Sequence, residues 1–102
     1  MPYAPLISET EILEGLRDLP EWRREGEALI RTVACATFRD AIELVNVVAD
    51  LAEAANHHPD MQVAWRRVTF MLTTKSAGGL SAKDLALAAQ IDSAIAAVAA
   101  RD

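Results

Sequence analysis

Two adjacent histidines in front of a proline are the residues of this sequence best suited to acid–base chemistry. His57 and His58 stand directly before Pro59. An imidazole, whose ordinary pKa is about 6.5, can donate or accept a proton near neutral pH. Taken alone, two such histidines are typical of a surface loop. They lack the spacing of a helical metal-ligand pair and no third ligand is evident, so the sequence predicts no metal site here.

Further polar residues that could belong to a site follow a stretch of alternating apolar side chains. Lys75 comes directly after Thr73 and Thr74, a Gly78-Gly79 pair supplies a turn, and Asp84 stands at the expected start of a helix. Asp84 could equally serve only the N-terminus of that helix, where a carboxylate contributes about 0.3–1 kcal/mol. Lys75 could equally be a surface lysine at the end of a strand.

Three helices are expected to position these residues. Ser8 and Glu11 form a capping-box pattern for a short helix that ends near Asp18. A second helix is expected over residues 37–56, and a third after Ser81. The expected inner stripe of the second helix is Phe38, Ile42, Val45, Val48, Leu51 and Ala55. The expected inner stripe of the third is Leu85, Ala88, Ile91, Ile95 and Val98.

The remaining patterned segments are expected to be strands. Residues 22–24 and 28–33 flank a Glu25-Gly26-Glu27 turn, which favours a hairpin. Residues 65–74 alternate as a half-buried strand does, with Arg66, Val68, Phe70, Leu72 and Thr74 on one face. A proline disfavours helical conformation in the residue before it, so residues 57–59 should lead out of the second helix into extended chain.

The order helix, hairpin, helix, strand, helix predicts an α+β fold, in which three helices pack on one face of a short antiparallel sheet. A hydrophobic content of 52% with only 5% aromatic residues suits helices on a small sheet. The length of 102 residues allows one domain, residues 1–102, and no second core.

Charge and hydropathy exclude several classes of partner. The formal net charge is −5 and the basic residues are scattered, which argues against nucleic-acid binding and against an anionic membrane surface. No stretch approaches the roughly 20 apolar residues of a membrane span, and the N-terminus lacks a signal-peptide pattern. We therefore expect a cytoplasmic protein. The single cysteine, Cys35, lies in an apolar segment that indicates a structural role.

The polar segments, taken in order, resemble the signature of the pterin-4a-carbinolamine dehydratase family. Members of that family typically show an acidic residue on a helix, a His-His-Pro, a Val-rich strand, a Thr-His pair, a Gly-Leu-Ser/Thr turn and an Asp at the next helix start. The matching segments here are 53–59, 73–75 and 78–84. The resemblance extends upstream through Trp22 and Phe38 and covers about 80 residues, far more than a generic short motif.

This resemblance implies a pterin pocket and a dehydration reaction. The implied catalytic residues are His57, His58 and Lys75. The implied substrate-binding residues are Glu53, Asn56, Pro59, Gly79, Leu80 and Asp84. The activity would be loss of water from a 4a-hydroxytetrahydropterin to give the quinonoid dihydropterin, without a metal or redox cofactor. Glu53 could instead be an ordinary solvated carboxylate.

Lys75 is the one departure from the family pattern, because it stands where members carry a third histidine. A lysine, with an ordinary pKa of about 10.4, can donate a proton or attract an oxygen but hardly accepts a proton at pH 7. Losing one positioned acid–base group typically costs roughly two to four orders of magnitude in rate. The sequence therefore predicts impaired dehydratase activity.

A second function class follows from the same resemblance. Relatives of this fold include a transcriptional coactivator that binds protein, and dehydratase-like proteins that act as RuBisCO assembly factors in α-carboxysomes. The Lys75 change also fits such a non-catalytic role, with RuBisCO as a protein client and a carboxysome-associated location. In either case the family implies a homo-oligomer, a dimer or a tetramer, to which the apolar last helix could contribute.

Overall fold

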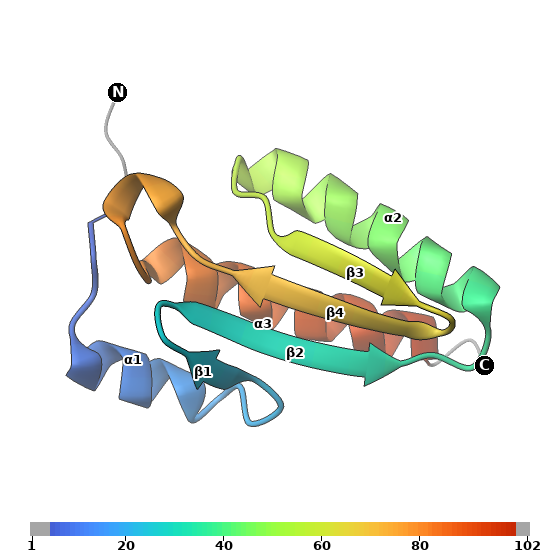
Figure 1. The fold of residues 1–102 in the computed structure, drawn as a ribbon, viewed down its shortest axis with the longest axis horizontal. Helices are drawn as coiled ribbons and strands as arrows, with labels where there is room; N and C mark the ends of the chain where they lie inside the picture. Colours follow the sequence, from blue (N-terminus) through green and yellow to red (C-terminus); the bar gives the residue numbers. More distant parts are fainter. Residues whose placement is uncertain (1–4, 100–102) are drawn as a thin grey trace.

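The computed structural model describes residues 5–99, so the first four and last three residues of the expected domain lie outside it (Figure 1). The elements in chain order are helix α1 (Glu9–Leu16), strands β1 (Arg23–Glu25) and β2 (Ala28–Ala34), helix α2 (Phe38–Ala55), strands β3 (Asp60–Ala64) and β4 (Arg67–Leu72), a 3-10 turn (Lys75–Ala77) and helix α3 (Ala82–Ala99).

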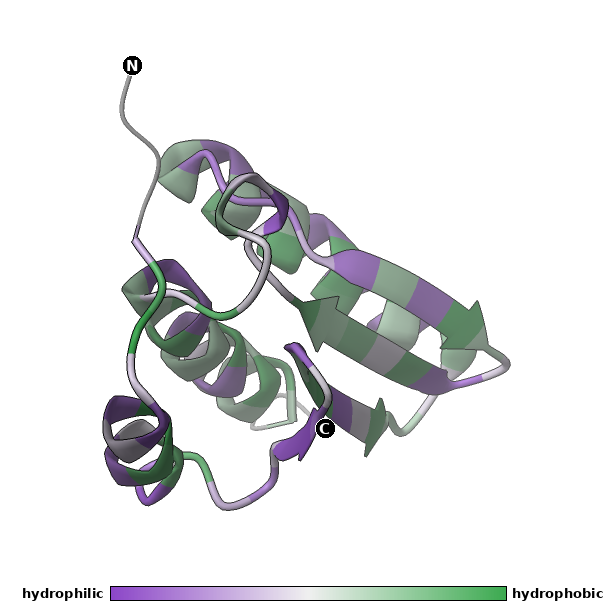
Figure 2. Ribbon diagram, turned by 60° about the vertical axis from the view of Figure 1, so that its left-hand side comes forward, coloured by the Kyte–Doolittle hydropathy of each residue, from purple (hydrophilic) through white to green (hydrophobic). Residues whose placement is uncertain are grey.

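The four strands form one antiparallel sheet in the order β1-β2-β4-β3. Helices α2 and α3 pack against each other and cover one face of this sheet (Figures 1 and 2). Helix α1 packs on α3, where a Cβ atom at Gly15 would lie 2.5 Å from Cδ1 of Leu85. The predicted α+β class with an antiparallel sheet is confirmed. Helix α1 belongs to the helical layer through its contact with α3.

Between the sheet and the helices lies the hydrophobic core. The largest fully buried apolar side chains are Leu29, Val68, Phe70 and Leu72 from the strands and Leu44, Val48, Leu87 and Ile91 from the helices. Each such side chain contributes about 1.5–3 kcal/mol of transfer free energy. The core therefore fixes the sheet against α2 and α3, the two helices next to the site described below.

Local capping signals in the sequence are confirmed. Ser8 and Glu11 form a reciprocal capping box at α1, and the Thr37 side chain accepts a hydrogen bond from the Asp40 N–H at α2. The β1–β2 hairpin turns at Gly26, whose φ of 58° lies in the left-handed region that glycine adopts without strain.

The expectation of one strand over residues 65–74 was wrong at both ends, since β4 stops at Leu72. Strand β4 begins only at Arg67, because Trp65 adopts a left-handed φ of 58° and forms a turn with Arg66. The Arg66 guanidinium lies 4.7 Å from the centroid of the Trp65 ring, and the backbone of Arg66 accepts a 2.8 Å hydrogen bond from the Cys35 N–H. This turn is held by a distant residue, which no local pattern could reveal.

Strand β3 was not predicted. Its five residues are mostly exposed, and Val63 is its only β-branched residue, so it lacks the usual signature of a strand. It forms by pairing with β4, from Asp60 opposite Met71 to Ala64 opposite Arg67. The buried alternation of Val68, Phe70, Leu72 and Thr74 along β4 and its continuation is confirmed.

The predicted inner stripe of α2 was also partly wrong. Phe38 is 55% exposed and Ile42 is 38% exposed. The buried face consists of Ala41, Leu44, Val48 and Ala52. Small alanines allow this face to approach the neighbouring elements closely, whereas the prediction had followed the largest apolar side chains. On α3, the buried residues include the predicted Ala88, Ile91 and Val98, while Leu85 and Ile95 are half-buried.

A partly buried polar cluster ties α3 to the first hairpin. Asp92 Oδ1 accepts a 2.8 Å hydrogen bond from Trp22 Nε1 and a 2.5 Å charged hydrogen bond from Arg31. Cys35 is buried at the edge of the core.

Across residues 5–99, none of the helices has both the length and the apolar character needed to cross a bilayer.

Candidate functional site

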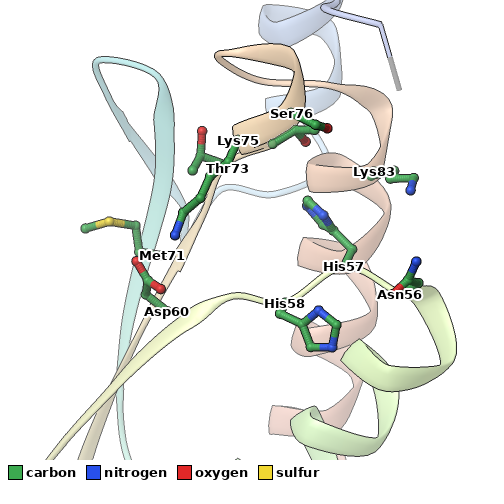
Figure 3. A pocket seen from close by; sticks show the side chains of 10 residues that line it. Asn56, His57, His58, Asp60, Met71, Thr73, Lys75, Ser76 and Lys83 are labelled. Atoms are coloured by element: carbon green, nitrogen blue, oxygen red, sulfur yellow. The ribbon is translucent and has the colours of Figure 1, made fainter. Parts of the chain in front are cut away.

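One cavity of about 360 Å³ lies where the chain leaves α2 and β4 (Figure 3). The lining residues are Asn56, His57, His58, Asp60, Met71, Thr73, Thr74, Lys75, Ser76 and Lys83. They include both histidines and both lysines of the whole sequence. The volume lies at the lower end of the range for small-molecule sites, roughly 300–1,000 Å³. Side chains capable of proton transfer and of anion binding are therefore gathered in one cavity.

The end of α2 directs the two histidines to different environments. Asn56 adopts left-handed φ and ψ of 50° and 44°, and the His57 N–H then donates to the carbonyl of Ala52. Asparagine is one of the few residues other than glycine that tolerates this conformation. The turn places His57 inward at 9% exposure, while the His58 side chain is 56% exposed. Pro59 then continues the chain as extended backbone toward β3.

His57 is held by a fully buried carboxylate. Its Nε2 atom lies 2.6 Å from Oδ1 of Asp84, which is 0% exposed. The other oxygen of Asp84 accepts 2.7 Å and 2.9 Å hydrogen bonds from the Thr74 hydroxyl and the Ser81 N–H. The Thr74 and Ser81 hydroxyls lie 2.7 Å apart. Because the Thr74 proton goes to Asp84, the Ser81 hydroxyl donates to Thr74.

This network fixes the tautomer of a neutral His57 ring. An ionised carboxylate only accepts hydrogen bonds, so Nε2 of His57 carries the proton that points to Asp84. The Nδ1 atom is then an acceptor, and no hydrogen bond from the described residues reaches it. Every buried polar side-chain atom in the described part of the chain has a partner. In its neutral form His57 therefore presents Nδ1 as a hydrogen-bond acceptor at the cavity wall.

His58 pairs with a different carboxylate, at the surface. Its Nε2 atom lies 2.5 Å from Oε2 of Glu53, which is on the last turn of α2. Both side chains are well exposed, so water weakens the electrostatic part of this contact. The pair restrains the ring of His58 near the mouth of the cavity, where it can exchange protons with solvent.

Lys75 is placed by a short closed loop. Thr74 and Gly79 exchange backbone hydrogen bonds of 3.0 Å and 3.3 Å, which close the 3-10 turn that begins at Lys75. Gly78 ends this turn with a left-handed φ of 76°. In Figure 3 the Lys75 side chain extends across the cavity toward the side formed by Met71 and Asp60.

The structure brings together some of the sequence-predicted site residues and not others. Asn56, His57, His58 and Lys75 line the cavity. Glu53 and Asp84 lie behind the lining and contact it through the two histidines. Pro59, Gly79 and Leu80 do not line the cavity. Pro59 and Gly79 shape the backbone beside it, and Leu80 belongs to the hydrophobic core. Trp65 is 71% exposed in the β3–β4 turn and lies outside the lining.

Sequence reasoning missed several residues of the site. Asp60, Met71, Thr73, Ser76 and Lys83 line the cavity, and Thr74 and Ser81 orient Asp84. A signal was present for Thr74, because it continues the buried face of β4 although it is polar. A buried polar residue needs a partner. For Asp60 and Met71 the signal was absent, since their proximity depends on the unpredicted pairing of β3 with β4.

No group of three or more His, Cys, Asp or Glu side chains among residues 5–99 has an arrangement that could hold a metal ion. The cavity instead offers ring nitrogens, ammonium groups and hydroxyls. Such groups suit hydrogen bonding to a polar heterocycle and proton transfer to or from it.

Comparison with protein families gives a match over most of the chain. Residues 5–94 match the family model described as pterin 4 alpha carbinolamine dehydratase. A relative from Nocardia farcinica is 52% identical over 85% of this chain and 92% of its own length. A relative from Roseiflexus castenholzii is 50% identical over 90% of this chain and 99% of its own length. Both are provisionally named pterin-4-alpha-carbinolamine dehydratase.

Solved structures share the fold. A crystal structure named transcriptional coactivator/pterin dehydratase, from Brucella melitensis, has a TM-score of 0.82 and 30% identity, with 91% of this chain and 97% of that chain covered. A pterin dehydratase-like protein, described as a RuBisCO assembly factor in the α-carboxysome, has a TM-score of 0.62 and 22% identity over 72% of this chain and 88% of its own. At that identity the second likeness concerns the fold alone.

Proposed function

This chain belongs to the pterin 4 alpha carbinolamine dehydratase family, and we propose that it dehydrates a 4a-hydroxytetrahydropterin in the cavity lined by His57, His58 and Lys75. The observation that carries the proposal is the His57–Asp84 pair. A buried carboxylate orients one imidazole at the cavity wall, and a second imidazole and an ammonium line the same cavity. The product would be the quinonoid dihydropterin and water.

The elimination needs two proton transfers. The bond between the ring carbon and the hydroxyl breaks as that oxygen receives a proton and leaves as water. A carbon–nitrogen double bond forms as the neighbouring ring nitrogen loses its proton. The reaction is redox-neutral, so it requires no redox cofactor. Nδ1 of His57 is suited to take the proton from the ring nitrogen, because Asp84 already binds the proton on Nε2.

Delivery of the other proton is assigned to the more exposed groups. The His58 side chain is exposed to water, and Lys75 can donate a hydrogen bond to the departing oxygen. An ammonium stabilises developing negative charge on that oxygen. At neutral pH, however, it rarely loses its own proton, so unlike a histidine it can hardly act as a base. We therefore propose a slower enzyme than a family member with histidine in the place of Lys75.

The experiment that tests this proposal is a turnover assay with freshly generated 4a-hydroxytetrahydropterin at pH 7. The natural chain would be compared with Lys75→His and His58→Ala, and with Arg67→Gln, an exposed cation outside the cavity, as a control. We expect His58→Ala to lose roughly 10²–10⁴-fold in rate and Lys75→His to gain about tenfold or more. Arg67→Gln should behave as the natural chain.

A natural chain that only matches the uncatalysed rate would make the dehydratase proposal wrong. A gain of activity by Lys75→His in that situation would show that the cavity keeps its catalytic geometry and lacks one group. The search for a function would then turn to protein partners.

A protein-binding role is the second candidate, and one surface of α2 favours it. Phe38 and Ile42, four residues apart, expose apolar side chains at 55% and 38% on one face of the helix. Strand β3 also stands at the edge of the sheet, where its free backbone groups can pair with another chain. These features suit a homo-oligomer. They also suit a client protein such as RuBisCO, which is named for the assembly factor of the same fold.

A further inference from the structure

Both lysines of the chain line the site cavity, although the chain as a whole has a net charge of −5. Lys75 and Lys83 line it, and Asp60 is the only carboxylate in the lining. Behind the lining, Asp84 accepts hydrogen bonds from Thr74 and Ser81 and contacts His57, and Glu53 contacts His58. The positive charge in the cavity is therefore local to Lys75 and Lys83, and an anion would be attracted where it contacts one of these ammonium groups.

Neither lysine is neutralised within the described part of the chain. No carboxylate lies within 4.0 Å of either ammonium, whereas Arg23, Arg24 and Arg31 each have an acidic partner at 3.4 Å or less. Both ammonium groups are available to a ligand.

Lys83 stands at a position that is unfavourable for helix stability. It is the second residue of α3, close to the positive end of the helix dipole, where a cation destabilises the first turn. Its backbone N–H donates to the Ser81 hydroxyl, and no carboxylate among residues 5–99 lies within 4.0 Å of its ammonium. A residue that breaks a local rule without a structural gain is a candidate for a functional one.

The two lysines serve different parts of the cavity. In Figure 3 Lys75 extends to one side of His57, toward Met71 and Asp60, while Lys83 and Asn56 lie on the other side. Lys75 is the residue assigned above to the reacting part of the pterin ring. With the reacting part of the ring placed at Lys75, as proposed above, a substituent on the opposite side of the ring would face Lys83 and Asn56. Their ammonium and amide groups can donate hydrogen bonds to an anion.

We infer that this cavity selects a pterin whose side chain ends in a phosphate monoester, and that Lys83 binds the phosphate. The inference rests on the proposed function, since it names the substrate class of the same site. It commits to an anion at the far end of an extended side chain, because the cationic side chain of Lys83 lies across His57 from that of Lys75. A neutral side chain would leave the charge of Lys83 without a ligand partner.

The test is an equilibrium titration of the protein with three oxidised, fluorescent pterins that are not turned over. Neopterin carries a neutral hydroxylated side chain, neopterin 3′-phosphate carries the same chain with an anion at its end, and pterin-6-carboxylate carries an anion directly on the ring. We expect the phosphate to bind roughly 5–10-fold more tightly than neopterin at low salt. The preference should shrink as ionic strength rises.

Lys83→Gln is the variant that assigns this preference to a residue. It should reduce the preference for the phosphate to less than about twofold while leaving the affinity for neopterin unchanged. Arg39→Gln, an exposed cation at the opposite end of α2 from the cavity, is the matched control and should keep the preference. Circular dichroism would confirm that both variants fold.

Equal affinities for neopterin and its phosphate would overturn the inference and leave the proposed function standing. A preference for the phosphate that survives Lys83→Gln would overturn it as well. An equal Lys83-dependent gain for pterin-6-carboxylate would be incompatible with an anion at the far end of the side chain. Failure of all three pterins to bind would reject both the inference and the proposed function.

Discussion

Nε2 of His57 lies 2.6 Å from Oδ1 of Asp84, a residue 27 positions further along the chain. The contact joins the end of α2 to the first turn of α3, and the Asp84 residue is fully buried. Asp84 also accepts the Ser81 N–H at the start of α3. One carboxylate thus stabilises the beginning of a helix and orients the imidazole that we assign as proton acceptor.

Replacing that carboxylate by an amide should disturb the chemistry more than the fold. In Asp84→Asn an amide nitrogen facing His57 would make Nε2 an acceptor, so Nδ1 would carry the proton and could no longer accept one. We expect a loss of roughly 10²–10⁴-fold in dehydratase turnover. Nitrogen chemical shifts of the His57 ring would report the tautomer.

Asp92→Asn is the matched control for that variant. Asp92 is also a carboxylate of α3, but it holds Trp22 and Arg31 instead of a cavity residue. This variant should lower the melting temperature and leave the turnover of the folded protein unchanged. Equal losses of turnover in both variants would show that the Asp84 effect is merely structural.

Thr74 should be more important to stability than its size suggests. Its hydroxyl donates to Asp84 and accepts from Ser81, and all three side chains are buried. Thr74→Val keeps the shape but leaves two polar groups short of a partner, which costs about 1–3 kcal/mol of unfolding free energy. Denaturant unfolding measures this loss.

The control for Thr74 is Thr32→Val on the outer face of the sheet. Thr32 makes a 2.8 Å hydroxyl contact with Thr69, but the pair is exposed and water can replace it. Its substitution should change the unfolding free energy by less than about 0.5 kcal/mol. If the two valine variants were equally stable, the buried network would contribute nothing beyond a surface contact.

The pairing of α1 with β1 should be visible as a shifted titration. The hydrogen bonds from the Arg24 guanidinium to Glu9 hold the pKa of that carboxyl below its ordinary value of 4.5. A carboxyl pKa that is lower in the folded state stabilises the fold above the unfolded pKa, and this contribution is lost as the pH falls through the folded pKa.

Arg24→Gln should therefore raise the pKa of Glu9 toward 4.5, as followed by NMR of the side-chain carboxyl carbon. Arg23→Gln is the control, because Arg23 pairs with Glu25 and should leave Glu9 unchanged. An unaltered Glu9 titration in Arg24→Gln would contradict the assigned cause.

Features encoded within a few residues were determined by the sequence itself. Contacts and dihedral preferences of near neighbours determine four such features. These are the capping box at Ser8, the cap at Thr37, the Gly26 hairpin and the end of α2 ahead of Pro59. The alternation along β4 likewise follows from the two-residue period of a strand. Together these signals define the α+β class and place His57 at the end of a helix.

The tertiary structure decided which of these residues meet. Strand β3 exists because β4 pairs with it, and the Trp65 turn is held by Cys35. The pairing of His57 with Asp84 needs α2 and α3 packed side by side, and Lys75 and Lys83 share a cavity only because the chain closes between Thr74 and Gly79. Propensity and periodicity describe single segments, whereas long-range hydrogen bonds and core packing bring the segments together. The sequence could therefore indicate some of the site residues, but it could not show how they are arranged.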